Sequence, residues 1–180
     1  MVLEALGIGP GMVVAEVGAG RGRYVIHSAY RVGLSGKVYA VDIDKSALEY
    51  LRDRCRREGL QNVETILGTV VDPKLQEGTL DLVYIISAYH HLADPVQLLK
   101  GIRPSLKPGG RLGIVEREPS KCGHPAWEDG ARARDRWEAV RKEDLVEEAH
   151  TAGYRLLNLH TFLPQDNIYV FITNSIPIRV

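Results

Sequence analysis

The stretch VVAEVGAGRGRY, residues 13–24, constrains the fold more than any other part of the chain. An apolar run at residues 13–17 has the character of a buried strand, and glycine then occupies every second position: Gly18, Gly20 and Gly22, with Ala19 between the first two. Glycine permits positive φ and lets a ligand approach the main chain closely. A helix that opens behind the glycines would present free N–H groups to that ligand. The stretch therefore predicts a strand–turn–helix unit whose turn passes under a bound molecule.

Short β-branched runs alternate with amphipathic segments along the rest of the chain. Strands are expected at residues 13–17, 37–43, 62–67, 80–87, 111–116, 154–162 and 168–173. Helices are expected at residues 23–31, 46–58, with Ser46 as N-cap, 95–106 and 142–152. Strands separated by helices form a parallel sheet through right-handed crossovers, whereas the short LPQDN turn can only join antiparallel strands. The pattern predicts a doubly wound, Rossmann-like α/β sheet that is mostly parallel, with an antiparallel pair at the C-terminus.

Bulk properties limit the classes of partner. The 180 residues fit one domain, and 23 basic residues balance 23 acidic ones, so no general attraction to nucleic acid or anionic membrane is expected. Two cysteines cannot build a disulfide framework, which favours a reducing compartment. No apolar run is long enough to span a bilayer. We expect a cytoplasmic, single-domain protein.

The neighbours of the glycines discriminate between ligands. A dinucleotide-binding loop follows G-x-G-x-x-G, but Arg23 stands at the place of the third glycine. Glu16, directly ahead of the loop, would repel a phosphate and would suit a cationic ligand. Asp42 ends the second strand, where a carboxylate can accept both hydroxyls of a ribose. A nicotinamide-dependent oxidoreductase is therefore the less favoured alternative.

Four ordered motifs, VVAEVGAGRG, VYAVDID, LDLVYIISAYHHLADP and LKPGGRLGIVE, together resemble class I S-adenosylmethionine-dependent methyltransferases, and TAGYRLLNLHTFLP extends the resemblance over nearly the whole chain. The resemblance implies a seven-stranded sheet and S-adenosylmethionine (SAM) as cofactor. It places the glycine loop under the methionine part, with Glu16 near the ammonium group. It places Asp42 on the ribose, Ile43 beside the adenine, Gly68 and Thr69 where an acid often meets the adenine amino group, and Ser87 near the methionine.

Candidates for proton transfer follow the fourth strand: Tyr89, His90 and His91. A general base is needed only if the methyl acceptor arrives protonated, and a histidine titrates in the suitable range. The competing interpretation is that these residues pack or hydrogen-bond structurally. Glu116 and Glu118 end the fifth strand, facing either the substrate or solvent. Adjacent histidines rarely share one ion, so no metal site is expected.

The sequence thus predicts a SAM-dependent methyltransferase that acts on an unidentified small molecule. Relatives usually carry a helix ahead of LGIGPG that closes over the site, and here that lid is short or absent. The lid could instead come from residues 117–137, which show no period, or from a second subunit in a homodimer. A non-catalytic, cofactor-binding or regulatory subunit remains the main alternative.

Overall fold

The structure, a computed structural model, describes residues 1–122 and 138–174. Its strands are β1 (Val13–Val17), β2 (Lys37–Asp42), β3 (Val63–Leu67), β4 (Leu80–Ile86), β5 (Leu106–Arg117), β6 (Tyr154–His160) and β7 (Asp166–Thr173). Its helices are α1 (Val2–Ala5), α2 (Val25–Val32), α3 (Lys45–Arg57), α4 (Pro95–Ile102) and α6 (Lys142–Thr151). Short 3₁₀ turns lie at η1 (Tyr89–His91), η2 (Arg103–Ser105) and η3 (Pro119–Cys122).

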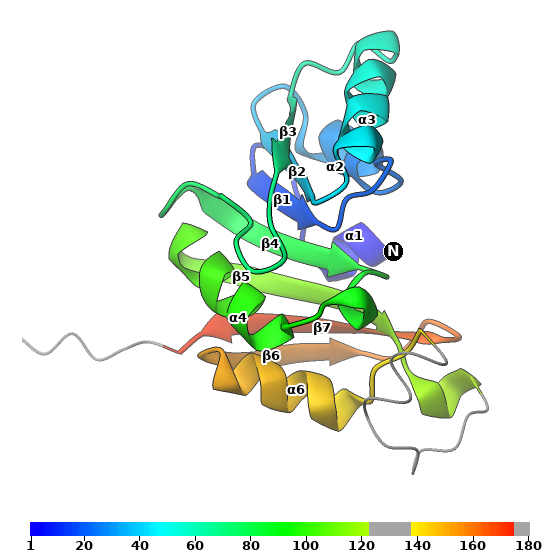
Figure 1. Ribbon diagram of the computed structural model, residues 1–180, viewed down its shortest axis with the longest axis vertical. Helices are drawn as coiled ribbons and strands as arrows, with labels where there is room; N and C mark the ends of the chain where they lie inside the picture. The colour runs from blue at the N-terminus through cyan, green and yellow to red at the C-terminus, as the bar shows by residue number, and fades with distance from the viewer. Residues whose placement is uncertain (123–137, 175–180) are drawn as a thin grey trace, which may run out of the picture.

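The seven strands form one sheet in the order β3-β2-β1-β4-β5-β7-β6 (Figure 1). Strands β1 to β5 pair in parallel, and β7 runs antiparallel to both β5 and β6. This confirms the predicted mostly parallel sheet with an antiparallel C-terminal pair. The chain winds outward from β1 to β3 and then returns to β4, so the strand order reverses between β1 and β4. Ligands of such sheets bind at this reversal, beyond the carboxyl ends of the strands.

Helices cover both faces of the sheet, and side chains alternate between them along each strand. Ala15 and Val17 of β1 pack with the buried residues of α4 and α6. Val14 packs in the second cluster, with the buried residues of α2 and α3. Glu16 alternates with Ala15 and Val17 and therefore faces the α2 side, directly under the start of that helix.

The N-terminal residues join the second cluster instead of covering the carboxyl edge. Leu6 and Ile8 follow α1 and are fully buried or nearly so. Leu6 lies against Gly113 of β5, where an added Cβ would come within 2.4 Å of its Cδ2 atom. At the N-terminus, where the sequence predicts a short or absent lid, the structure has a single helical turn whose following residues close the apolar core.

Several predicted boundaries are wrong, and three of them bear on the site or on the sheet. The N-cap of α3 is Asp44, not Ser46, because the Asp44 carboxylate accepts hydrogen bonds from the backbone N–H groups of Ser46 (2.8 Å) and Ala47 (3.2 Å). Helix α4 stops at Ile102, and η2 follows it. Strand β5 begins at Leu106, not at residue 111, since the LKPGG stretch lies within the strand, where its pairing with β4 is irregular.

The segment at residues 117–137, a predicted lid, lies only partly within the structure. Arg117 ends β5 and Pro119–Cys122 form η3, whereas residues 123–137 lie outside the described residues. Among the helices in the described ranges, none combines the length and the apolar character that a bilayer crossing requires.

Candidate functional site

A cavity of about 410 Å³ opens at the carboxyl ends of β1, β2 and β4, at the reversal of strand order. Its walls come from the ends of these strands, the loop after β3 and the start of the α4 region. It is lined by Val17, Gly18, Val41, Asp42, Ile43, Thr69, Val70, Pro73, Ser87, Ala88, His91, Leu92, Ala93 and Leu98. No residue from 1–12 lines it, so the N-terminal turn is not its lid. The cavity lies where the fold predicts a ligand.

The three loop glycines all have positive φ, but they serve different purposes. An added Cβ at Gly18 would come within 2.6 Å of the Ala88 Cβ atom, and one at Gly22 would overlap the buried Leu51 side chain. An added Cβ at Gly20 would meet nothing within 4 Å. Gly18 and Gly22 are therefore needed by the packing of the loop itself, while Gly20 borders open space that a ligand can fill.

Asp42 hydrogen-bonds to the glycine loop and also lines the cavity. Its Oδ2 atom accepts a hydrogen bond from the Gly20 N–H (2.7 Å), and its Oδ1 atom accepts one from the Asp44 N–H (2.9 Å). An ionised carboxylate has about four acceptor positions, so two remain for hydroxyl groups. Asp42 can thus hold the glycine loop and a ribose together.

Glu16 is the buried carboxyl group at the base of the loop. Its side chain is almost fully buried, and among the described residues nothing donates a hydrogen bond to its Oε2 atom. Burial raises the pKa of Glu16 to about 8; the negative charge of Asp42 adds to the increase, and the Tyr84 hydroxyl opposes it. Tyr84 lies beside Glu16 on β4 and is itself hydrogen-bonded to Ser28 of α2 (2.7 Å). A buried carboxyl group with one oxygen left without a donor, next to an open loop, suits a cationic ligand group.

The raised pKa of Glu16 predicts a specific pH dependence of stability. The folded protein keeps this proton up to pH about 8, whereas the unfolded chain loses it near 4.5. Because the folded state binds more protons in this window, the free energy of unfolding falls as pH rises from about 4.5 to about 8. Glu16→Gln removes the titrating group. In urea unfolding series, the wild type should lose stability relative to this variant across the window; parallel curves would show that Glu16 is not neutral in the fold.

Apolar side chains flank the far end of the cavity, beyond Asp42. Ile43 is 63% exposed and Val70 is 48% exposed, although both are aliphatic. Thr69 also lines this end. Its backbone N–H donates to the Asp72 carbonyl (2.8 Å), so this donor is already paired within the chain. Gly68 lies one residue back, hydrogen-bonded to the Asp42 carbonyl (3.0 Å), and does not line the cavity. Exposed aliphatic groups in the lining of a cavity suit a flat ring such as adenine.

Backbone strain marks the opposite end of the cavity. Ser87 follows β4 with φ 51°, a region that non-glycine residues rarely adopt, and its N–H donates to the Val115 carbonyl (2.9 Å). Such strain is concentrated at functional sites. His91 also lines this end and is exposed. The predicted methionine and acceptor positions therefore share one wall.

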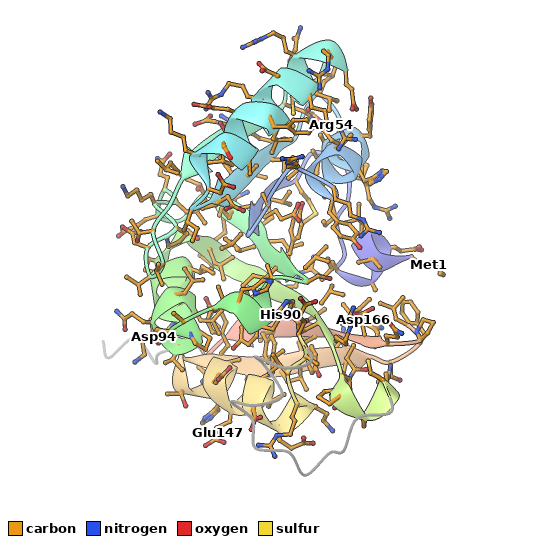
Figure 2. The ribbon with its side chains drawn as sticks, turned by 45° about the vertical axis from the view of Figure 1, so that its right-hand side comes forward. Met1, Arg54, His90, Asp94, Glu147 and Asp166 are labelled. Atoms are coloured by element: carbon orange, nitrogen blue, oxygen red, sulfur yellow. The ribbon has the colours of Figure 1, made fainter. Side chains whose placement is uncertain are left out.

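Tyr89 and His90 lie behind that wall. Tyr89 is fully buried and does not line the cavity. Its hydroxyl donates to Glu148 of α6 (2.7 Å), so this hydroxyl is paired within the chain. His90 lies near the middle of the molecule, past the end of β4 (Figure 2). Its Nδ1 atom is 3.0 Å from the Glu116 carboxylate, and its ring centroid is 4.0 Å from that of His91.

The structure brings six of the predicted site residues to the cavity wall: Gly18, Asp42, Ile43, Thr69, Ser87 and His91. The other predicted site residues do not line it: Glu16, Ala19, Gly20, Gly22, Gly68, Tyr89 and His90. The sequence reasoning missed the apolar lining, which includes Val70, Pro73, Leu92, Ala93 and Leu98. Their apolar character could signal burial but not which cavity they line. Within the described ranges, no cluster of three His, Cys, Asp or Glu side chains could hold a metal ion.

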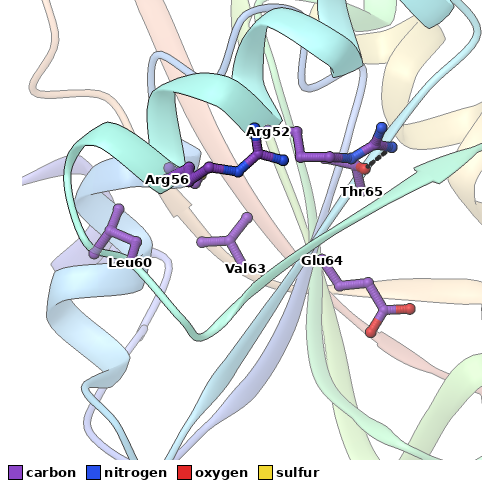
Figure 3. Close-up of a pocket in the computed structure, with 7 residues that line it drawn as sticks. Arg52, Arg56, Leu60, Val63, Glu64 and Thr65 are labelled. Atoms are coloured by element: carbon purple, nitrogen blue, oxygen red, sulfur yellow. Dashed lines mark hydrogen bonds between the residues drawn. The ribbon is translucent and has the colours of Figure 1, made fainter.

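A second hollow, of about 380 Å³, lies between α3 and β3 at the edge of the sheet (Figure 3). Arg52 donates there to the Thr65 hydroxyl (2.8 Å), and Arg56 pairs with Asp53 (2.9 Å). Both guanidinium groups thus have partners within the chain. Burial also raises the pKa of the Cys55 thiol above its usual range, which makes it a poor nucleophile. This hollow has the character of a solvated helix face.

Comparisons with known proteins match the part of the chain that carries this site. A family model described as "Methyltransferase domain" matches residues 14–110, which include the glycine loop, Asp42 and the cavity wall after β4. The chain is 33% identical over 128 residues to an uncharacterized transposon protein of Streptomyces fradiae (71% of this chain, 34% of the relative). It is 34% identical over 115 residues to the ubiquinone/menaquinone biosynthesis C-methyltransferase UbiE of Hydrogenovibrio crunogenus (63% and 45%). The chain thus spans less than half the length of these relatives.

Solved structures share the architecture. A SAM-dependent methyltransferase from Aquifex aeolicus superimposes with a TM-score of 0.82 at 24% identity, over 94% of this chain and 86% of that one. The likeness supports the fold of the sheet. Together with the matched domain, the glycine loop and the paired acids at the ends of β1 and β2, it leads to one conclusion: the chain belongs to the class I SAM-dependent methyltransferase family.

Proposed function

We propose that the chain transfers a methyl group from SAM to an apolar small molecule. The observation that carries the proposal is the buried Glu16 carboxyl, whose Oε2 atom has no donor among the described residues, beneath an open glycine loop with Asp42 at its edge. In this arrangement Glu16 would face the ammonium group, Asp42 the ribose, and Ile43 and Val70 the adenine. When bound, SAM supplies an electrophilic methyl carbon on a positively charged sulfur.

The acceptor class follows from the wall near Ser87. Leu92, Ala93 and Leu98 make this part of the cavity apolar, while His91 is the titratable group that lines it. An apolar molecule with one hydroxyl group or acidic carbon matches this lining. Relatives named ubiquinone/menaquinone C-methyltransferase and demethylmenaquinone methyltransferase support a quinol-like acceptor.

The test is formation of S-adenosylhomocysteine (SAH) from SAM with naphthohydroquinone and with a panel of phenols, thiols and amines. Turnover should require an acceptor, and the product should gain the mass of one methylene. Cofactor binding without SAH formation over the whole panel would favour a non-catalytic, regulatory subunit instead. Stabilisation of the fold by NAD but not by SAM, measured by thermal shift, would favour the oxidoreductase alternative; at 100 times Kd a ligand adds about 2.7 kcal/mol.

Several coarser features belong to the same proposal. We expect residues 1–180 to fold as one domain in the cytoplasm, without a nucleic-acid substrate, and a homodimer would supply cover for the cavity. The balanced charge and the two free cysteines support these expectations. Light scattering of the purified chain tests for the homodimer, and cell fractionation tests the location in the cytoplasm.

A further inference from the structure

We propose that Glu116 is a positioning residue that holds the His90 ring as the Nδ1–H tautomer and leaves Nε2 as the proton acceptor of the site. The assignment of the tautomer stands on contacts within the chain. The use of Nε2 in turnover rests on the proposed function.

Glu116 is fixed by three contacts at the end of β5. Its side chain is 1% exposed. Oε1 accepts hydrogen bonds from the Arg117 N–H (2.8 Å) and lies 3.0 Å from His90 Nδ1, while Oε2 accepts from the His90 N–H (3.1 Å). Both oxygens therefore face N–H donors of the backbone, which leaves the carboxylate as an acceptor. Because an ionised carboxylate can only accept, the His90 nitrogen that faces it must carry the proton.

The second ring nitrogen of His90, Nε2, remains available as a hydrogen-bond acceptor. No described residue donates a hydrogen bond to Nε2 or accepts one from it. The ring is 6% exposed and lies against His91, with the two ring planes tilted by 54°. Because His91 lines the cavity, the buried pair of His90 and Glu116 stands directly behind the apolar wall where the acceptor is proposed to bind.

In this arrangement a buried carboxylate orients a histidine ring and can stabilise its protonated form. For a hydroxyl acceptor that reaches past His91 to the His90 ring, the O–H bond breaks, the proton joins Nε2, and the electron pair stays on the oxygen as the nucleophile. The imidazolium so formed lies beside the negative charge of Glu116, and it later gives its proton to water. A thiol or amine acceptor needs less help of this kind, so the pair points to an acceptor that must lose a proton from oxygen or carbon.

Glu118 offers a matched control on the same strand end. It is also buried, but its carboxylate contacts other groups: the Lys142 N–H (3.1 Å) and the Asn167 side chain (3.3 Å). It therefore has no contact with the His90 ring. Glu118→Gln removes a buried charge of the same type without touching the proposed pair.

The experiment is long-range ¹H–¹⁵N NMR of histidine-labelled protein without cofactor, at a pH where imidazole is neutral. The chain has six histidines, and a His90→Gln sample assigns the resonances of His90. The wild type should show a protonated Nδ1 and an unprotonated Nε2. In Glu116→Gln these two signals should shift toward the opposite tautomer, because a side-chain amide cannot accept at both positions; in Glu118→Gln they should not.

Two results would overturn the proposal. One is a wild-type His90 that carries its proton on Nε2, which needs no variant to detect. The other is a His90 tautomer that Glu116→Gln, folded by its backbone spectrum, leaves unchanged. Since the spectra are recorded without SAM, a failure of cofactor binding would refute the proposed function and leave this result standing.

Discussion

Asp42→Ala is expected to weaken SAM binding by about 3 kcal/mol, roughly 100-fold in Kd. The carboxylate has two acceptor positions free for the ribose hydroxyls, and each charge-assisted hydrogen bond contributes about 1.5 kcal/mol. The same substitution also releases the Gly20 N–H, which Asp42 holds at 2.7 Å. Calorimetric titration with SAM, and separately with SAH, measures the loss.

Asp44→Ala is the control for this prediction. Asp44 carries the same charge two residues later, but its side chain caps α3 through Ser46 and Ala47 and does not line the cavity. We expect the control to lower thermal stability and to keep the affinity for SAM. Equal affinities of wild type and Asp42→Ala would place the ribose elsewhere.

Gly22→Ala is expected to lower the free energy of unfolding by about 2–4 kcal/mol. At φ 80° an L side chain is strained by about 1–2 kcal/mol, and the new methyl group overlaps Leu51, whose side chain is fully buried. Urea unfolding measures this loss directly.

Gly20→Ala separates packing from ligand binding. Gly20 also has positive φ, 51°, but a Cβ there meets nothing within 4 Å of the chain. We expect a loss of about 1–2 kcal/mol in stability, from backbone strain alone, together with weaker SAM binding. If Gly20→Ala bound SAM like the wild type, the open side of the loop would not be where the cofactor passes.

Much of the fold could be predicted because each strand carries its own local signal. The apolar run of β1, the turn before β7 and the alternation of helices and strands predict a mostly parallel sheet with an antiparallel C-terminal pair. The structure confirms these strand directions. The boundaries at Asp44 and Leu106 could not be read in this way. They depend on which side chain reaches a helix N-terminus and on pairing with a strand distant in sequence.

The candidate site shows the same division. Asp42 and Ile43 follow directly from the end of a strand, so their place at the cavity was predictable. The pairing of His90 with Glu116 joins residues 26 positions apart that only the β4–β5 register brings together. Tyr89, adjacent to both histidines in sequence, is turned into the core by η1 and meets Glu148 of α6, a contact that no local pattern encodes.

The central claim is that Glu16, the glycine loop and Asp42 form a SAM site. The most direct measurement is calorimetric titration of the chain with SAM near pH 7 in buffers of different ionisation enthalpy. Because the pKa of Glu16 is raised to about 8, the free protein holds this proton, and a cation placed beside the carboxyl group should release it. We predict saturable one-to-one binding with release of up to one proton. This proton release should be absent in Glu16→Gln. Absence of binding by folded protein, or binding with no buffer dependence, would contradict the account.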